Sequence, residues 1–190
     1  MEVDAPIPRI RTERLLLREW RQADLEPFAA LNADPLVMEY FVAPLSREAS
    51  DRLVERIRAG WTANGYGLWA VERTVDQQFL GFTGLALHTF EAPFTPAVEI
   101  GWRFGPAAWG SGYATEAAVA ALGFGFETAG RAEILSWTAV GNERSQRVME
   151  RIGMTRDHAG DFEHPSIPVG HPLRPHVLYR LSRTDWVARR

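Results

Sequence analysis

The sequence predicts one domain of the mixed α/β class, with a central, mostly antiparallel twisted sheet of about seven strands flanked by helices. Strand-like and helix-like segments follow the order strand, helices, three strands, helix, strand, helix and two strands. The 190 residues suit a single domain, and a hydrophobic content of 46% supports a sizeable core. Because no repeat or linker divides the chain, we expect one domain over residues 1–190, with residues 1–9 as a flexible N-terminal extension.

The first third of the chain predicts a strand and two helices. "RTERLLLREW" indicates a strand centred on residues 15–18, "QADLEPFAALN" a helix, and "ADPLVMEYF" a short helix or turn. Ser46 is a favourable N-cap for a helix from Arg47 to about Ala63, which the glycines of "NGYG" end. Its amphipathic stripe consists of Leu53, Val54, Ile57 and Trp61.

The remaining elements alternate between strands and helices. "LWAVER", "FLGFTGLAL" and "AVEIGWRF" predict three strands, separated by a polar turn and a proline-containing loop. A helix is expected from Tyr113 to about Thr128, then a buried strand at "AEILSWTA" and a short helix stopped by Gly153. "MTRDHA" starts another strand, a loop rich in histidine and proline covers residues 161–175, and "HVLYRLS" is the final strand.

The composition excludes several kinds of chemistry. The chain has no cysteine, which removes disulfides, thiolate metal sites and an acyl-cysteine intermediate. All 21 basic residues are arginine, as expected of a GC-rich genome, so a Schiff-base or P-loop lysine is excluded. The net charge of −3 provides no basic field for nucleic acid, and no apolar run is long enough to span a membrane. We therefore expect a soluble cytoplasmic protein without nucleic-acid or membrane partners.

The stretch "WGSGYATEA" places two glycines directly before a predicted helix. A helix N-terminus offers unpaired N–H groups and partial positive charge, and bare glycine backbone lets a phosphate reach them. The alternative is that Gly110 and Gly112 only shape a tight turn. A dinucleotide fingerprint is excluded because Thr115 stands where its third glycine or alanine is needed.

Residues 98–154, with "VEIGWRFGPAAWGSGYATEAAVAAL" and "GNERSQRVMERIGM", resemble the GNAT superfamily of N-acetyltransferases, and most closely its ribosomal-protein N-terminal alanine/serine acetyltransferases. "RTERLLLREW" and the order of elements extend the resemblance over nearly the whole chain. Gly112 and Ala114 match the family's acetyl-CoA loop, whereas Trp109 departs from its Gln/Arg position. The resemblance implies a V-shaped splay between the fourth and fifth predicted strands, with the pantetheine arm of acetyl-CoA in the gap.

The resemblance also implies which residues bind acetyl-CoA, the co-substrate. These are Trp102, Arg103, Phe104, Trp109, Gly110, Ser111, Gly112, Tyr113, Ala114, Asn142 and Ser145. Trp102 and Phe104 also fit ordinary core positions, and Asn142 also fits a plain helix cap. No metal is expected, because the histidines between His158 and His176 match no metal-ligand spacing.

Two residues are candidates for proton transfer. Ser145 is expected to protonate the departing thiolate, and Glu99 on the central strand to accept the amine proton if burial raises its pKa. The alternative for Ser145 is a solvated helix serine. The alternatives for Glu99 are a solvated strand residue and a partner for an arginine. His164, in the loop "DFEHP", is a competing base, or a residue of an ordinary surface loop.

The expected activity is direct transfer of an acetyl group to a primary amine, such as a protein N-terminus. The alternative acceptor is a small amine such as an antibiotic, a polyamine or an amino acid. A non-catalytic CoA- or nucleotide-binding regulatory module is the remaining alternative. We expect a monomer or a homodimer.

Overall fold

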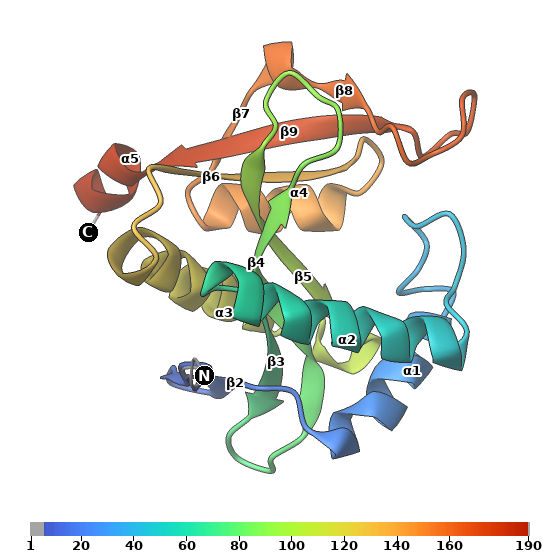
Figure 1. Cartoon of the computed structure of the whole chain (residues 1–190), viewed down its shortest axis with the longest axis vertical. Helices are drawn as coiled ribbons and strands as arrows, with labels where there is room; N and C mark the ends of the chain where they lie inside the picture. Colours follow the sequence, from blue (N-terminus) through green and yellow to red (C-terminus); the bar gives the residue numbers. More distant parts are fainter. Residues whose placement is uncertain (1–5, 190) are drawn as a thin grey trace.

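The computed structural model describes residues 6–189 and shows one continuous sheet of nine strands (Figure 1). The strand order is β1-β2-β3-β4-β5-β6-β9-β7, and β8 pairs with β9. The strands are β1 Ile10–Arg11, β2 Leu15–Arg18, β3 Leu68–Arg73, β4 Phe79–His88, β5 Ala97–Phe104, β6 Glu133–Ala139, β7 Thr155–Arg156, β8 Phe162–Glu163 and β9 Pro175–Ser182.

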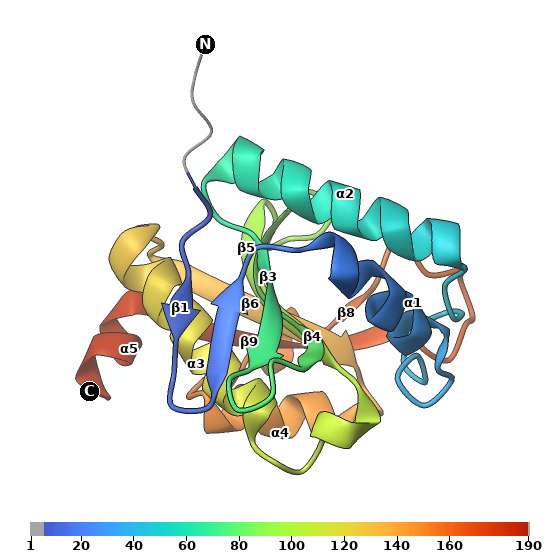
Figure 2. The ribbon, with the colours of Figure 1, turned by 90° about the horizontal axis from the view of Figure 1, so that it is seen from below.

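Helices cover both faces of this sheet. The α-helices are α1 Leu25–Ala33, α2 Arg47–Asn64, α3 Tyr113–Gly123, α4 Glu143–Arg151 and α5 Arg183–Ala188. Short helical turns are η1 Gln22–Asp24, η2 Pro106–Ala108, η3 Phe124–Thr128 and η4 His158–Gly160. Helices α1 and α2 lie on one side of the strands, and α3 and α4 lie on the other (Figure 2). None of the helices within residues 6–189 is long and apolar enough to cross a membrane.

The sheet opens in its middle. Strands β1 to β5 are antiparallel neighbours, and β4 and β5 pair over eight positions from Gly81↔Phe104 to His88↔Ala97. Strands β5 and β6 are parallel and pair only at Glu99↔Leu135. Beyond this point they diverge, and β6 and β9 run across the direction of β3 and β4 (Figure 1). The predicted splay between these two strands is therefore confirmed.

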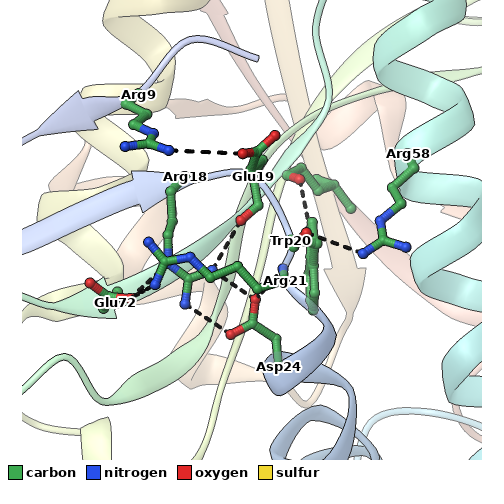
Figure 3. Close-up of polar contacts among 9 residues, drawn as sticks. Arg9, Arg18, Glu19, Trp20, Arg21, Asp24, Arg58 and Glu72 are labelled. Carbon is green, nitrogen blue, oxygen red and sulfur yellow. Dashed lines mark hydrogen bonds and ion pairs between the residues drawn. The ribbon is translucent and has the colours of Figure 1, made fainter. Parts of the chain in front are cut away.

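A buried ion network anchors the first strands to the start of α1 (Figure 3). The Arg18 guanidinium donates to both carboxylate oxygens of Asp24, at 2.7 and 2.8 Å, and to Glu72 at 2.7 Å. Arg21 donates to the same Glu72 oxygen at 2.9 Å. Burial lowers the pKa of Arg18, but Asp24 and Glu72 raise it by more, so the guanidinium stays charged.

Most predicted elements are present, with four differences. Ser46 caps α2 by accepting from the Ala49 N–H, and Gly65 ends α2 at φ 71°. The helix that begins at Tyr113 is α-helical only to Gly123 and continues as the π-helical turn η3. Strands β1 and β8 and helix α5 were not expected, and they are short elements of two to six residues. Such short segments show too little periodicity to be predicted.

The predicted N-terminal extension is described only in part, since residues 1–5 lie outside the described residues. Of its remainder, Ile7 packs against the core, and the Pro8 carbonyl accepts a hydrogen bond from the Trp69 indole at 2.8 Å.

Candidate active site

A cleft of about 1070 Å³ opens where β5 and β6 part. Its walls come from β4, β5 and β6, from the loop before α3, from α4, and from the α1–α2 segment. The loop around His164 closes one end. Of the residues predicted to act in the site, all line this cleft except Ser111. The splay therefore brings together segments that lie far apart in the sequence.

The glycine loop at one end of the cleft has the conformation that bare backbone allows. Gly110 and Gly112 have φ values of 73° and 79°, in the left-handed region that side chains disfavour. Gly112 is the N-cap of α3 and has no side chain to satisfy the first turn. Within residues 6–189, no acceptor meets the N–H groups of Tyr113 and Ala114. The loop is thus a tight turn that glycine permits, as the structural interpretation expects, and it leaves donors exposed, as binding of a phosphate would require.

Arg14 fixes the outer side of this loop. Its Nη1 donates to the Ser111 carbonyl at 2.9 Å, and its guanidinium lies over the Tyr113 ring at 4.7 Å. Glu116, in the first turn of α3, accepts from the Arg14 Nε at 2.7 Å and from the Thr12 hydroxyl at 2.6 Å. These contacts turn the Glu116 carboxylate toward β1 and β2, and so away from a phosphate bound at the loop. Because Arg14 holds the Ser111 carbonyl on the outer side of the loop, Ser111 does not line the cleft.

Trp109 and Arg144 join the loop to the neighbouring elements. The Trp109 indole donates to the Phe104 carbonyl at 2.8 Å, which ties the loop to the end of β5. The Arg144 guanidinium stacks on the Trp109 ring at 4.3 Å and pairs with Glu39 at 2.5 Å. The α1–α2 segment, to which Glu39 belongs, therefore reaches across the cleft to α4. The Glu39–Arg144 contact was not predicted, because its two residues lie about a hundred positions apart in the sequence.

Strand β5 presents different side chains to the two faces of the sheet. Phe104 is buried and Trp102 packs against the main core, so the core interpretation of both residues holds. Glu99 and Arg103 alternate with them and face the side of α1 and α2. The Ser136 hydroxyl donates to the Ile100 carbonyl at 2.9 Å across the vertex of the splay.

Helix α4 brings Asn142 and Ser145 to the opposite wall. The Asn142 side chain accepts from the Ser145 N–H at 3.2 Å, so it caps the helix. Its Nδ2 also donates to the Thr138 hydroxyl at 2.9 Å. Ser145 is half-buried, and its hydroxyl hydrogen-bonds no other residue of 6–189.

Glu99 is paired with a residue that the sequence did not single out for catalysis. Its Oε2 lies 2.7 Å from Nε2 of His88 on β4. The two atoms are close enough for an ion pair, but their geometry does not meet that of a hydrogen bond. The strand register explains the contact, because Glu99 lies opposite Ala86, two residues from His88. Burial lowers the pKa of His88, but the Glu99 carboxylate raises it by more, to above its ordinary value of 6.5. The prediction allowed a partner for Glu99 but expected an arginine.

His164 and His176 lie near this pair, inside an aromatic cluster. The cluster consists of Phe90, Phe94, Trp137 and Phe162. The imidazoles of His164 and His176 lie 5.0 Å apart, and His88 packs on Trp137 at 4.8 Å. Burial and the nearby His176 lower the pKa of His164, and burial lowers that of His176. His158 and His171 lie outside the cleft lining, and no three residues within 6–189 are grouped to hold a metal ion.

Comparison with known proteins identifies the family. The sequence profile described as "Acetyltransferase (GNAT) domain" matches residues 14–155. The Bacillus subtilis protein YkkB is 32% identical over 147 residues, 77% of this chain and 84% of that protein. The Aspergillus fumigatus FsC-acetyl coenzyme A-N(2)-transacetylase is 28% identical over 187 residues, 95% of this chain and 78% of that enzyme. A crystal structure of a GNAT-family acetyltransferase from Bacillus anthracis superposes with a TM-score of 0.77 at 28% identity, covering 93% of this chain and 99% of that one. The chain therefore belongs to the GNAT acetyltransferase family and is an N-acetyltransferase.

Proposed function

We propose that this enzyme moves the acetyl group of acetyl-CoA directly to a primary amine, without an acyl-enzyme intermediate. The observation that carries this proposal is the single cleft, which is lined by the glycine loop, by Ser145 and by the Glu99–His88 pair. A donor site and a proton acceptor thus share one cavity. The absence of cysteine agrees with direct transfer.

The donor half of the cleft has the features that a CoA thioester needs. The N–H groups of Tyr113 and Ala114 meet no acceptor among the described residues, which supports a pyrophosphate site at the start of α3. The gap between β5 and β6 leaves strand backbone for the pantetheine amides to pair with, as an added strand does. Asn142 and the loop residues Trp109 and Gly110 line the same path.

The chemical step follows from the groups on the two walls. Glu99, supported by His88, takes the proton from the acceptor ammonium, and the neutral nitrogen attacks the thioester carbonyl. A backbone N–H near Phe104 stabilises the tetrahedral oxyanion. When the C–S bond breaks, the Ser145 hydroxyl donates its proton to the leaving thiolate. The nitrogen, which carries an extra proton after attack, gives that proton up as the amide forms, and this proton restores the Ser145 hydroxyl. Positioning of the amine against the thioester supplies most of the acceleration.

A panel of acceptors tests the proposal. Purified enzyme is incubated with acetyl-CoA and with peptide N-termini or small amines, and free CoA is measured with a thiol reagent. Release of CoA together with an acetylated amine, identified by mass spectrometry, supports the proposal. Binding of acetyl-CoA without transfer to any amine would instead identify a CoA-binding sensor, whereas thermal protection by ATP but not by acetyl-CoA would identify a nucleotide-binding module.

The assignment of the base has its own test. Glu99→Gln is expected to lower kcat/KM by about 10²-fold or more. His164→Ala is expected to keep most of the wild-type kcat/KM, since no hydrogen bond or ion pair joins the His164 imidazole to Glu99 among the described residues. His158→Ala, outside the cleft, is the matched control. The opposite result, with Glu99→Gln active and His164→Ala inactive, assigns the role to His164.

A further inference from the structure

Arg103 is a half-buried cation in the wall of the cleft. It lines the cavity from β5, and no Asp or Glu within residues 6–189 forms an ion pair with it. Its Nε is buried and has no hydrogen-bond partner among the described residues. Burial lowers the pKa of Arg103 to about 10, so the side chain is still positively charged at neutral pH. A charge that is partly removed from water in this way is costly unless something pairs with it.

The surroundings of Arg103 hold it in place without neutralising it. Nη1 donates to the Asn32 side-chain oxygen at 2.5 Å, and Asn32 is itself fixed by donating to the Ser50 hydroxyl at 2.8 Å. The guanidinium lies 4.2 Å from the centre of the Phe41 ring and 5.5 Å from that of Phe82. Asn32 and the two rings thus orient the guanidinium, while its Nε–Nη2 edge has no partner among the described residues.

The position of Arg103 relative to Glu99 points to the acceptor rather than to the donor. The two residues are four positions apart on β5, so their side chains face the same side, with Cα atoms about 13 Å apart. The phosphate-binding donors lie beyond the end of β5, at the start of α3. An acceptor whose amine reaches Glu99 therefore extends along β5 toward Arg103.

We propose that Arg103 binds a carboxylate of the acceptor, so that the enzyme prefers primary amines that carry a carboxylate several bonds from the nitrogen. This inference rests on the proposed function and names the class of its acceptor. The Nη2 end of the guanidinium, which is not one of the buried atoms, is available to donate a charge-assisted hydrogen bond to that carboxylate. Asn32, Phe41 and Phe82 act as positioning residues for this contact.

The test uses ω-amino carboxylates of increasing chain length and the matching ω-amino carboxamides. Each pair has the same amine and the same spacer and differs only in the charge at the far end. With the wild-type enzyme, we expect kcat/KM for the best carboxylate to exceed that for its carboxamide by roughly tenfold or more, as for hydrogen bonds to charged groups.

Arg103→Gln is expected to abolish this preference. KM for acetyl-CoA is expected to change little, because the resemblance to GNAT enzymes places residues 102–104 against CoA through their strand backbone, which the substitution leaves in place. Arg103→Lys is expected to keep part of the preference, because it retains the charge but loses the planar fork. Because the preference is a ratio measured on one protein sample, partial loss of folding does not alter it. Arg56→Gln, an exposed arginine that lines the same cleft, controls for the change in net charge and is expected to keep the full ratio.

Three results would overturn the inference. They are equal use of carboxylates and carboxamides by the wild-type enzyme, a preference that survives in Arg103→Gln, and a rise in KM for acetyl-CoA as the main effect of that variant. Failure of every amine to accept an acetyl group would instead overturn the proposed function. In that case, the role of Arg103 is decided by the melting temperature. A larger increase with the carboxylates than with the carboxamides, seen in the wild-type protein and lost in Arg103→Gln, supports the carboxylate contact, and equal increases contradict it.

Discussion

Individual side chains in the cleft acquire their roles from neighbours on other strands. Glu99 and His88 face each other because β4 and β5 pair in the observed register. Arg103 forms no ion pair with a described Asp or Glu, whereas the buried Arg18 is neutralised by Asp24 and Glu72. The same residue type therefore holds two strands and a helix together in one place and, in our proposal, binds a ligand carboxylate in the other.

The His88–Glu99 contact predicts a measurable titration. By NMR, the His88 imidazole is expected to titrate above its ordinary value of 6.5, because the Glu99 carboxylate favours the protonated ring. In Glu99→Gln only burial remains, so the pKa of His88 is expected to fall below that value. The pKa of His88 is higher in the folded protein than in the unfolded chain. The stability that the pair contributes is therefore complete at a pH below the unfolded-state pKa, and it is lost as the pH rises through the folded-state pKa. An unshifted His88 titration in Glu99→Gln would show that the pair does not interact.

Ser145 is predicted to act mainly in the transition state. Ser145→Ala is expected to lower kcat by about 10²-fold, the low end for a general acid, because a thiolate leaves readily. KM for acetyl-CoA is expected to change little, since an acid that protonates the leaving group acts in the transition state rather than in the bound ground state. Ser166→Ala, which alters another hydroxyl that lines the cleft, serves as the matched control. A wild-type rate in Ser145→Ala, with chemistry shown to be rate-limiting, would remove this assignment.

Among the secondary-structure elements, α3 and its glycine loop combine a structural requirement with a binding one. Any side chain at Gly112 is strained at φ 79°, whatever it does to a ligand. Gly65, the C-cap of α2, has φ 71° and lies outside the cleft lining, so it separates the two effects.

Gly112→Val and Gly65→Val are expected to destabilise the fold to a similar extent. Only Gly112→Val is expected to weaken acetyl-CoA binding, by roughly tenfold or more, because its side chain blocks hydrogen bonds from the α3 amides to phosphate. Calorimetry measures the affinity, and urea unfolding measures the stability. Equal affinities in the two variants would mean that the pyrophosphate does not bind at this loop.

The ion network that joins β2, β3 and the start of α1 predicts a large loss of stability (Figure 3). Glu72→Gln leaves Arg18 and Arg21 without one of their counter-ions, and we expect it to lower the free energy of unfolding by about 3 kcal/mol. Glu19→Gln, which removes the exposed pair with Arg9, is expected to change it by less than about 1 kcal/mol. Urea unfolding of both variants checks the contrast, and a similar small effect at both positions would contradict it.

For the molecule as a whole, the cleft predicts that acetyl-CoA stabilises the folded state. The ligand contacts α3, α4, β5 and β6 only when they are assembled, so it binds the folded protein and not the unfolded chain. At about 100 times its dissociation constant it is expected to add roughly 2.7 kcal/mol, seen as a higher melting temperature. An unchanged melting temperature at millimolar acetyl-CoA would contradict the assignment of this cleft to CoA.

The sequence by itself determined the order of the main strands and helices, the N-cap Ser46, the glycine loop and the resemblance to GNAT enzymes. These features depend on periodicity, capping and turn residues, which act over a few neighbouring positions. The tertiary structure alone decided the Glu99–His88 contact, the anchorage of the glycine loop by Arg14, the Glu39–Arg144 contact across the cleft, and the lack of an ion pair between Arg103 and any Asp or Glu of residues 6–189. Each of these depends on strand register or on packing between segments far apart in the chain, and no local pattern specifies which distant side chains meet.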